Sequence, residues 1–328
     1  MSFYVNASQS PTPAQRELAT RASQFGDALT LAGPGGPKLM RELRDSGFRG
    51  AVLLDAVGYA GRPINPVTWA QEQAALGVDR VLMPGVYVPW TKGEIGTLGS
   101  VVEVECPVAA DLDATLLLAI DARWIANGIE AVIDALACGC PVALVLADAG
   151  DPLERKEAAA NLRRLIVCHP GTALLRSDHG GLAVTAWGDG HCSIGLSTST
   201  RHFVASDMAA FKSRDDSPRV FVRGLLDWFK GSQLAGWDAA NVPIRCSFPC
   251  CGGGSLGELY FSGDNARAAV RHNMHALADF ADHILNAPRE DRASVFREAC
   301  ERAASYYGLP GIRGPVEMKS QLKRWVYS

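Results

Sequence analysis

Apolar runs alternate with amphipathic stretches through the first half of this chain, and this rhythm constrains the fold more than any other feature. The runs are rich in Val, Ile, Leu and Ala, and they occupy residues 27–33, 49–60, 78–88, 114–121, 141–148 and 172–178. Strands that are apolar on both faces and alternate with helices are typical of a parallel sheet covered by helices. The sequence therefore predicts an α/β fold.

The number of strand–helix units favours a closed barrel over an open sheet, because no polar linker interrupts them. A helix around residues 204–213 and a last strand over residues 218–226 would complete eight strands. The residues up to about 25 are polar and end in a predicted helix. We therefore expect a (β/α)8 TIM-like barrel over residues 1–240, with an N-terminal helical extension. Residues 241–328 are expected to form a zinc-binding helical subdomain.

A group of cysteines near residue 250 is the reason for expecting zinc. Cys246, Cys250 and Cys251 lie close together in the sequence, and His272 follows on a predicted helix. Three thiolates and one imidazole form a common tetrahedral ligand set for structural Zn²⁺. His275 is a rival ligand. The alternative is that these residues are ordinary thiols and an ordinary helix histidine.

Composition limits the cellular compartment and the binding partners that we expect for this protein. Nine cysteines, without an N-terminal signal-peptide pattern, indicate a reducing environment, and we expect a cytoplasmic protein. No apolar run is long enough to predict a membrane span. The net charge of −3 argues against non-specific binding of polyanions, while Lys319, Lys323 and Arg324 form either a basic face or a solvated helix end. The cysteines far from residue 250 are interpreted as core residues.

Acidic residues recur at the predicted strand ends, where barrel enzymes place their active sites. One such carboxylate most often caps the following helix, but several on one rim favour a site, because like charges brought together require a functional reason. A Gly-Gly pair beyond the sixth run permits either close approach of a flat ligand or a tight turn. We expect a catalytic role for Asp55 and Asp227. The predicted substrate-binding residues are Asp121, Asp148, Asp178, Gly180 and Gly181.

Four segments resemble the tRNA-guanine transglycosylases and their DNA 7-deazaguanine-inserting relatives. GGLAV at residues 180–184 resembles that family's GGLAVGE segment, and LLDAVGYAG around Asp55 resembles a degraded LTDSGGFQ strand end. Residues 65–85 resemble its helix–strand unit, and CSFPCC followed by RHN is similar to its C-x-C-x-x-C…HN zinc site. The segments occur in the family's order and cover roughly residues 45–285.

The resemblance implies a zinc-bearing barrel that exchanges a base by double displacement. It implies that Asp55 transfers a proton and that Asp227 attacks the ribose anomeric carbon. Two departures matter. The family's base-reading Asp is replaced by Pro84–Gly85, and its VQGG glutamine is absent from the segment around Asp148. Either the substrate differs, or the barrel has lost catalysis and is a partner subunit.

The expected function is that of a transglycosylase-like pentosyltransferase that cleaves or exchanges the N-glycosidic bond of a (7-deaza)purine base in nucleic acid. Its expected partners are DNA or RNA and a purine-like base, with a protein partner or a second copy of the chain as further possibilities. One alternative is a catalytically silent zinc-bearing barrel that binds nucleic acid or a partner subunit. Another is a barrel enzyme of different chemistry that acts on a small ligand.

Overall fold

The protein is described by a computed structural model that covers residues 1–25, 28–94, 96–209, 214–242, 244–260, 264–308 and 317–327. The chain divides into two compact units. The first comprises Met1–Gly195 and Ser199–Ala210, and the second comprises Leu196–Thr198 and Phe211–Ser328.

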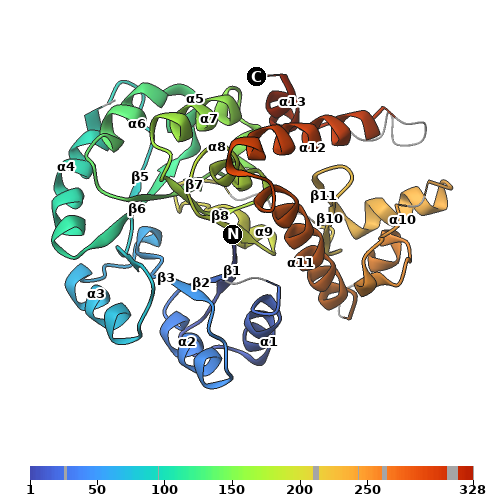
Figure 1. Ribbon diagram of the computed structural model, residues 1–328, viewed down its shortest axis with the longest axis horizontal. Helices are drawn as coiled ribbons and strands as arrows, with labels where there is room; N and C mark the ends of the chain where they lie inside the picture. Colours follow the sequence, from blue (N-terminus) through green and yellow to red (C-terminus); the bar gives the residue numbers. More distant parts are fainter. Residues whose placement is uncertain are drawn as a thin grey trace. The chain divides into compact units, whose positions relative to one another are not determined.

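A parallel sheet forms the centre of the first unit, in the order β3-β2-β1-β9-β8-β7-β6-β4, with β5 also paired to β6. The sheet is curled, and the helices of this unit surround it (Figure 1). The predicted α/β fold with a parallel sheet is confirmed. The strands are β1 Ser2–Asn6, β2 Ala28–Ala32, β3 Ala51–Asp55, β4 Val81–Leu82, β5 Val86–Val88, β6 Ala114–Asp121, β7 Val142–Ala147, β8 Ala173–Ser177 and β9 Cys192–Gly195.

Apolar side chains on both faces explain the helical cover of the sheet. All residues of β7 are buried, as are Leu116 to Asp121 on β6. Helix starts follow the capping rules, since Thr12 forms a capping box with Gln15, and Asn65 accepts a hydrogen bond from the Thr68 amide. The helices of this unit are α1 Pro13–Ala22, α2 Gly36–Asp45, α3 Pro66–Ala75, α4 Gly96–Asp111, α5 Ala122–Asn127, α6 Ile129–Leu136, α7 Ala158–Cys168 and α8 Ala183–Trp187, with the short 3-10 turns η1 Gly58–Ala60, η2 Pro152–Glu154 and η3 His179–Leu182.

The first strand lies where the sequence predicted only a polar start and a helix. β1 pairs with β2 on one side and with β9 on the other, so that Phe3 stands beside both Leu29 and Ile194. Phe3 and Val5 are completely buried. The prediction of an N-terminal helical extension is therefore wrong for residues 2–6, because these few residues are an inner strand of the sheet.

The last predicted barrel strand is also wrong. β10 (Arg219–Val222) pairs antiparallel with β11 (Asp227–Lys230) in a two-stranded sheet of the second unit. Residues 223–226 form a tight turn, with Leu226 at φ 46°, and this turn reverses the chain instead of ending a parallel strand. Residues 214–240 therefore belong to the second unit, not to a barrel that extends to residue 240. The helix predicted around 204–213 is not formed over 204–209, and its remainder lies outside the described residues.

The two edges of the parallel sheet approach each other just beyond β3. The Gly58 amide donates a hydrogen bond to the Pro84 carbonyl over 2.9 Å, between η1 and the segment that separates β4 from β5. A Cβ atom at Gly58 would lie 2.7 Å from that same oxygen. Only glycine permits this contact without displacement of the backbone.

The second unit combines the β10–β11 hairpin with helices that pack through aromatic side chains. Phe296 contacts Phe280 and Trp325, with ring centroids 5.8 and 5.6 Å apart. Asn273 accepts a hydrogen bond from the Phe221 amide, which ties a long helix to β10. The elements are α10 Gly231–Ala239, η4 Pro249–Cys251, η5 Leu256–Tyr260, α11 Asp264–Leu285, η6 Arg289–Asp291, α12 Arg292–Tyr306 and α13 Ser320–Tyr327. Among the described residues, no helix has the length and hydropathy needed to span a bilayer.

The contacts of β1 generate a prediction about pH. The Ser2 hydroxyl lies 2.9 Å from Thr30 Oγ1 and 2.8 Å from His191 Nε2. Burial lowers the pKa of His191 to about 3, and the charge of Arg80 adds to this effect. The unfolded chain binds a proton at this histidine near pH 6.5 but the folded chain does not, so stability should fall as the pH decreases from about 6.5 toward 3. The expected loss is about 1 kcal/mol per pH unit.

Chemical denaturation at pH 7.0 and pH 5.5 measures this loss. His191→Gln retains a hydrogen-bonding side chain that does not titrate, so its stability should change less between the two pH values than that of the wild type. Equal changes in the two proteins would show that His191 does not cause the pH dependence.

Candidate functional site

Four of the predicted aspartates share one local geometry. Asp55, Asp121, Asp148 and Asp178 follow or end β3, β6, β7 and β8, and in each of them Oδ1 accepts a hydrogen bond from the amide two residues later. The distances are 2.8, 2.8, 2.9 and 2.8 Å. This arrangement satisfies an amide that has left the sheet. All four carboxylates therefore have a structural role at the carboxyl end of a strand.

The second carboxylate oxygen distinguishes the four. Asp121 Oδ2 accepts a hydrogen bond from Arg123 Nη2 over 2.6 Å, and Asp148 Oδ2 accepts one from Arg155 Nε. Asp121 also caps α5. The arginines lie on the segments that directly follow the strands, so each of these two pairs is a local ion pair. Arg123 contacts both carboxylate oxygens of Asp121, whereas Arg155 contacts Oδ2 of Asp148.

Asp55 has a different environment. It is completely buried, and its Oδ2 accepts hydrogen bonds from the hydroxyls of Tyr4 over 2.6 Å and Tyr59 over 2.8 Å. The two hydroxyl oxygens lie 3.1 Å apart. Tyr4 comes from the inner strand β1, Tyr59 from η1 and Asp55 from the edge strand β3, so three separate elements contribute to one buried group. We call Asp55, Tyr4 and Tyr59 the Asp55 cluster.

Burial controls the protonation of this cluster. It raises the pKa of Asp55, although the hydrogen bonds from Tyr4, Val57 and Tyr59 oppose the shift. It also raises the pKa of Tyr4 and of Tyr59, so both phenols stay protonated and donate hydrogen bonds. The cluster can therefore hold a proton on a carboxyl group at a higher pH than an exposed aspartate can.

A strained arginine lies beside the cluster. Arg176 on β8 adopts φ 51°, a conformation that is unfavourable for any residue with a side chain. Its guanidinium carbon lies 5.9 Å from the ring centroid of Tyr4 and 5.4 Å from that of Phe203. Its charge partly offsets the effect of burial on the pKa of Asp55. Backbone strain that places a cation beside a buried carboxyl is typical of functional sites.

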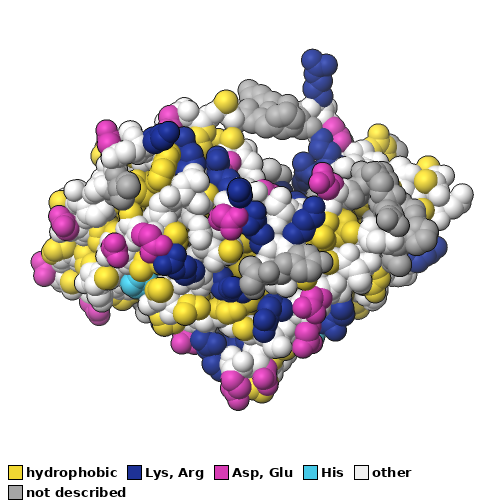
Figure 2. Space-filling model, turned by 90° about the horizontal axis from the view of Figure 1, so that it is seen from above, with side chains coloured by type: hydrophobic (Ala, Val, Ile, Leu, Met, Phe, Trp, Pro, Cys, Tyr) yellow, Lys and Arg dark blue, Asp and Glu magenta, His cyan; other side chains and the backbone are white. Residues whose placement is uncertain are grey.

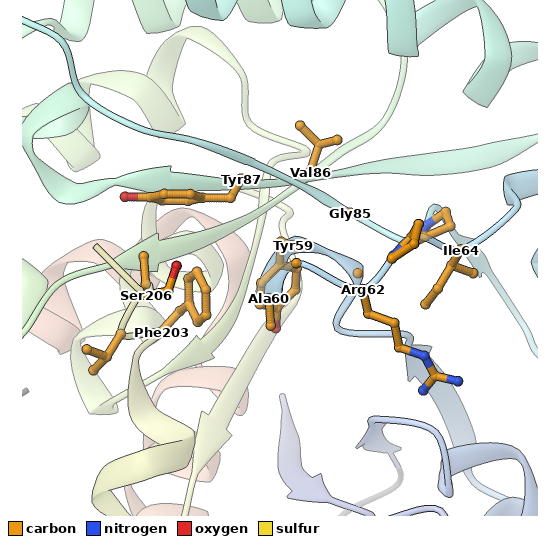
Figure 3. A pocket seen from close by; sticks show the side chains of 15 residues that line it. Tyr59, Ala60, Arg62, Ile64, Gly85, Val86, Tyr87, Phe203 and Ser206 are labelled. Atoms are coloured by element: carbon orange, nitrogen blue, oxygen red, sulfur yellow. The ribbon is translucent and has the colours of Figure 1, made fainter. Parts of the chain in front are cut away.

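A pocket of about 630 Å³ adjoins the cluster (Figure 3). Three aromatic rings meet there: Phe203 makes edge-on contacts with Tyr59 and Tyr87, at centroid distances of 4.9 and 5.7 Å. Burial raises the pKa of Tyr87 to about 12. Gly85 has φ 87°, and a Cβ atom there would lie 2.8 Å from the Tyr59 ring. The walls of the pocket are formed by residues 58–64, 84–87 and 203–206.

Tyr59 belongs to both the pocket wall and the Asp55 cluster. Tyr59 therefore contributes to the pocket wall and, through its hydroxyl, to the hydrogen bonds of the buried carboxyl group. Sequence reasoning identified Asp55 but missed Tyr4, Tyr59, Tyr87 and Phe203. The tyrosine four residues after the strand-end aspartate was the one local signal available.

The Gly-Gly pair serves packing. Gly180 and Gly181 lie in η3, where the Gly180 amide binds Asp178. A Cβ atom at Gly181 would lie 2.1 Å from Ser177 Oγ and 2.9 Å from Cys192 Sγ. The close approach expected at this pair is therefore made by the protein's own side chains. Neither glycine, nor Asp178, is among the residues that line the pocket.

Asp227 is not at the end of a barrel strand, contrary to the expectation. It is the first residue of β11 in the second unit, and it is buried. Its carboxylate accepts hydrogen bonds from the Trp228 amide over 2.6 Å and from the Tyr307 hydroxyl over 3.3 Å. Lys319 Nζ lies 2.8 Å from its Oδ1. Asp227 and Asp55 therefore occupy separate hydrogen-bond networks in separate units.

The predicted metal ligands of the second unit come together. The donor atoms of Cys246, Cys250, Cys251 and His272 all lie within 4.8 Å of one another. His272 Nδ1 is 3.3 Å from Cys246 Sγ and 3.5 Å from Cys251 Sγ, and the sulfurs of Cys250 and Cys251 are 3.6 Å apart. Tetrahedral ligands at zinc bond lengths are separated by roughly 3.5 to 3.8 Å. This group, called the Cys₃His cluster, can hold one metal ion.

The surroundings of His272 orient it as a ligand. Its Nε2 lies 2.9 Å from the Phe221 carbonyl, so a proton on Nε2 leaves Nδ1 free to face the thiols. Burial lowers the pKa of His272, which favours the neutral imidazole that metals require. The ring of His275 instead stacks on Phe248 at 6.4 Å. The structure thus selects His272 over His275.

Comparison with known proteins adds no relative. No protein-family model matches the sequence, and no curated protein is significantly similar to it.

The cluster predicts the metal content of variants. Cys251→Ser and His272→Asn each remove one of four donors, so each should lower the metal bound by the Cys₃His cluster by at least ten-fold. His275→Asn changes the neighbouring histidine without removing a donor and should retain the metal. Elemental analysis of the purified proteins measures the result. Full retention in His272→Asn, or loss in His275→Asn, would contradict the assignment.

Proposed function

We propose that this protein is a transglycosylase-like enzyme that cleaves or exchanges the N-glycosidic bond of a (7-deaza)purine base in nucleic acid. One observation carries the proposal. A buried carboxyl group, Asp55, is hydrogen-bonded by two tyrosines at the carboxyl end of a parallel strand, and one of them lines an aromatic pocket. The residues that suggested the transglycosylase resemblance include this same aspartate.

Departure of a base requires a proton. When the bond between the anomeric carbon and the base nitrogen breaks, its electron pair goes to the base, and protonation of the base makes it a better leaving group. Burial raises the pKa of Asp55, so this carboxyl group keeps a proton that it can supply to a higher pH than an exposed aspartate does. Tyr59 lines the pocket, and its hydroxyl is hydrogen-bonded to Asp55. If the hydroxyl proton of Tyr59 passes to the base while protonated Asp55 gives its proton to the Tyr59 oxygen, the proton is relayed and the phenol stays neutral.

The pocket suits a flat heterocycle. Tyr59, Tyr87 and Phe203 offer ring faces and edges, and its volume is in the range of small-ligand sites. Pro84 and Gly85 line it where the resembling family has a base-reading carboxylate. Main-chain groups would then read the base instead of an acidic side chain, which fits a substrate that differs from guanine.

The Cys₃His cluster is proposed to hold a structural Zn²⁺. Four protein ligands leave no open position for a substrate, and three thiolates with one imidazole favour zinc over harder ions. A thiol-rich metal site is suited to a reducing compartment such as the cytoplasm. We further propose that the curled sheet closes into a TIM-like barrel, with the Gly58–Pro84 hydrogen bond as its seam.

The resemblance implies that Asp227 is the nucleophile. Its ion pair with Lys319 and its place in the second unit do not support this role, so the proposal rests on Asp55 alone. Direct attack by the incoming base or by water at the oxocarbenium-like carbon requires no protein nucleophile.

A second candidate function is a catalytically silent zinc-bearing barrel that binds nucleic acid or a partner subunit. The supporting observation is that Asp121, Asp148 and Asp227 are each paired with a cation of this chain. In Figure 2, basic side chains lie among acidic ones where the described residues are drawn. Direct capture of nucleic acid by charge alone is therefore less well supported than binding of a protein partner.

Base exchange tests the main proposal. Asp55→Asn retains the shape of the side chain but cannot donate the proton, so incorporation of labelled guanine or 7-deazaguanine into DNA or tRNA should fall by about 10²-fold or more. Asp151→Asn is the matched control, because asparagine can still accept the hydrogen bond from the Leu153 amide. The Asp151→Asn variant should retain the wild-type exchange activity to within a few-fold.

Two outcomes would oppose the proposal. Equal activity in Asp55→Asn and the wild type would exclude the proton-transfer role. If the wild type shows neither exchange nor hydrolysis on any of these substrates, yet co-purifies stoichiometrically with a partner subunit, the second candidate function is correct.

Tyr4 offers a subtler test through pH. Its hydrogen bond lowers the pKa of Asp55, so Tyr4→Phe should raise that pKa. The proton-donating form of Asp55 would persist to higher pH, and the alkaline limb of the kcat/KM profile should move upward by about one pH unit. A profile that keeps its alkaline limit, with only a lower plateau, would assign Tyr4 a structural role.

A further inference from the structure

A second group of thiols lies in the first unit, outside the Asp55 cluster and its pocket. Cys106 on α4 and the pair Cys138 and Cys140, between α6 and β7, place their sulfurs within 4.8 Å of one another. The Cys138 and Cys140 sulfurs are 3.3 Å apart, and the Cys106 sulfur lies 3.8 Å from the Cys138 carbonyl. We call these three residues the Cys₃ cluster.

A turn in the backbone brings the side chains of Cys138 and Cys140 together. α6 ends at Leu136, and Gly139 then adopts φ 85°, a left-handed conformation that glycine enters without strain. This turn brings the side chains on either side of Gly139 together, and β7 begins directly after it. The third thiol arrives from a helix more than thirty positions earlier in the sequence. Convergence of three thiols from two separate segments is more than a local Cys-x-Cys spacing provides.

Exposure separates this group from ordinary core cysteines. Cys106 is buried, but Cys140 is half-buried and Cys138 is exposed, and all three are free thiols. A core thiol is surrounded by apolar atoms, whereas this cluster opens to solvent on one side. The sequence-based interpretation of these residues as core cysteines is therefore wrong for Cys138, which is exposed, and Cys140 is only half-buried.

A hollow of about 660 Å³ between α4 and α6 leads to the cluster. Cys106 and Cys138 form part of its wall, and the exposed carboxylates of Glu103 and Asp134 lie along it. Negative charge beside an open path raises the local concentration of cations. The hollow therefore provides an entry route for a metal ion.

We propose that the Cys₃ cluster is a second metal site, which binds one thiophilic ion through three thiolates and leaves a fourth position open. Three soft sulfur donors select ions such as Zn²⁺ and Cu⁺ over Mg²⁺ or Ca²⁺. Each thiol releases its proton as the metal–sulfur bond forms, so no oxidant or reductant is required. With three ligands and an exposed rim, this site exchanges its ion more readily than the Cys₃His cluster.

Cobalt titration of the full-length chain tests the proposal. After removal of metal by a chelator under reducing conditions, wild type should bind two equivalents of Co²⁺, both with thiolate-to-cobalt absorption. The double variant Cys138→Ser/Cys140→Ser should bind one equivalent, as should Cys251→Ser, and the triple combination should bind none. Cys168→Ser changes an exposed thiol of α7 outside the cluster and should still bind two.

The design isolates each site. Because Cys138 is exposed and Cys140 half-buried, the double variant should unfold at nearly the wild-type temperature, which thermal denaturation checks. Competition with Zn²⁺ and with Cu⁺ under anaerobic conditions then distinguishes the ions: displacement by Zn²⁺ at stoichiometric amounts identifies a zinc site, and displacement by Cu⁺ alone identifies a copper site. A single equivalent in the wild type, or two in the double variant, would overturn the proposal. So would a Cys138–Cys140 disulfide that forms readily while no second ion binds.

Discussion

Burial of both faces of the parallel sheet is the constraint on which the first unit depends. Strands such as β7, in which every residue is buried, leave no room for polar side chains along their length. The aspartates lie instead at the strand ends, where amides leave the sheet without a partner. Asp55, Asp121, Asp148 and Asp178 meet this need in the same way, each through Oδ1. Their recurrence is first of all a consequence of backbone hydrogen bonding.

The partner of the remaining oxygen decides what each carboxylate can do. An arginine, as at Asp121 or Asp148, compensates the negative charge and fixes the side chain. Two phenols, as at Asp55, satisfy the same oxygen without adding a positive charge, so the effect of burial on the pKa survives. The same geometry thus gives a proton-holding group at Asp55 and local ion pairs at Asp121 and Asp148. Counting acidic residues at strand ends cannot make this distinction.

Features that depend on residues close together in the sequence could be predicted, whereas features that depend on distant contacts could not. The apolar runs at 114–121 and 141–148 coincide with β6 and β7 almost residue for residue, and Asn65 caps α3 as predicted. The run at 78–88 is broken into β4 and β5, because proline lacks an amide and Gly85 turns the chain. The Cys₃His cluster was also predictable, since three of its ligands are adjacent in the sequence. Each of these features depends mainly on residues that lie close together in the sequence.

What the sequence did not reveal depends on distant contacts. β1 has only five residues, so nothing in its own pattern marks it as an inner strand. Tyr4 reaches Asp55 only because β1 and β3 flank β2, and Cys106 reaches Cys138 only because α4 packs beside α6. The β10–β11 hairpin was assigned to the barrel because four turn residues resembled the end of a strand. Contacts between residues that are distant in the sequence cannot be predicted from the local spacing of residue types.

The place of β1 between β2 and β9 also has a consequence for biosynthesis. This strand is synthesised before β9, and its edge toward β9 stays unpaired until Ile194 has been translated and can join Phe3. Such a long sequence separation slows folding, and an open strand edge invites pairing with other chains. Nascent chains shorter than about two hundred residues should therefore depend on chaperones, and a circular permutant that begins just before β9 would shorten this delay.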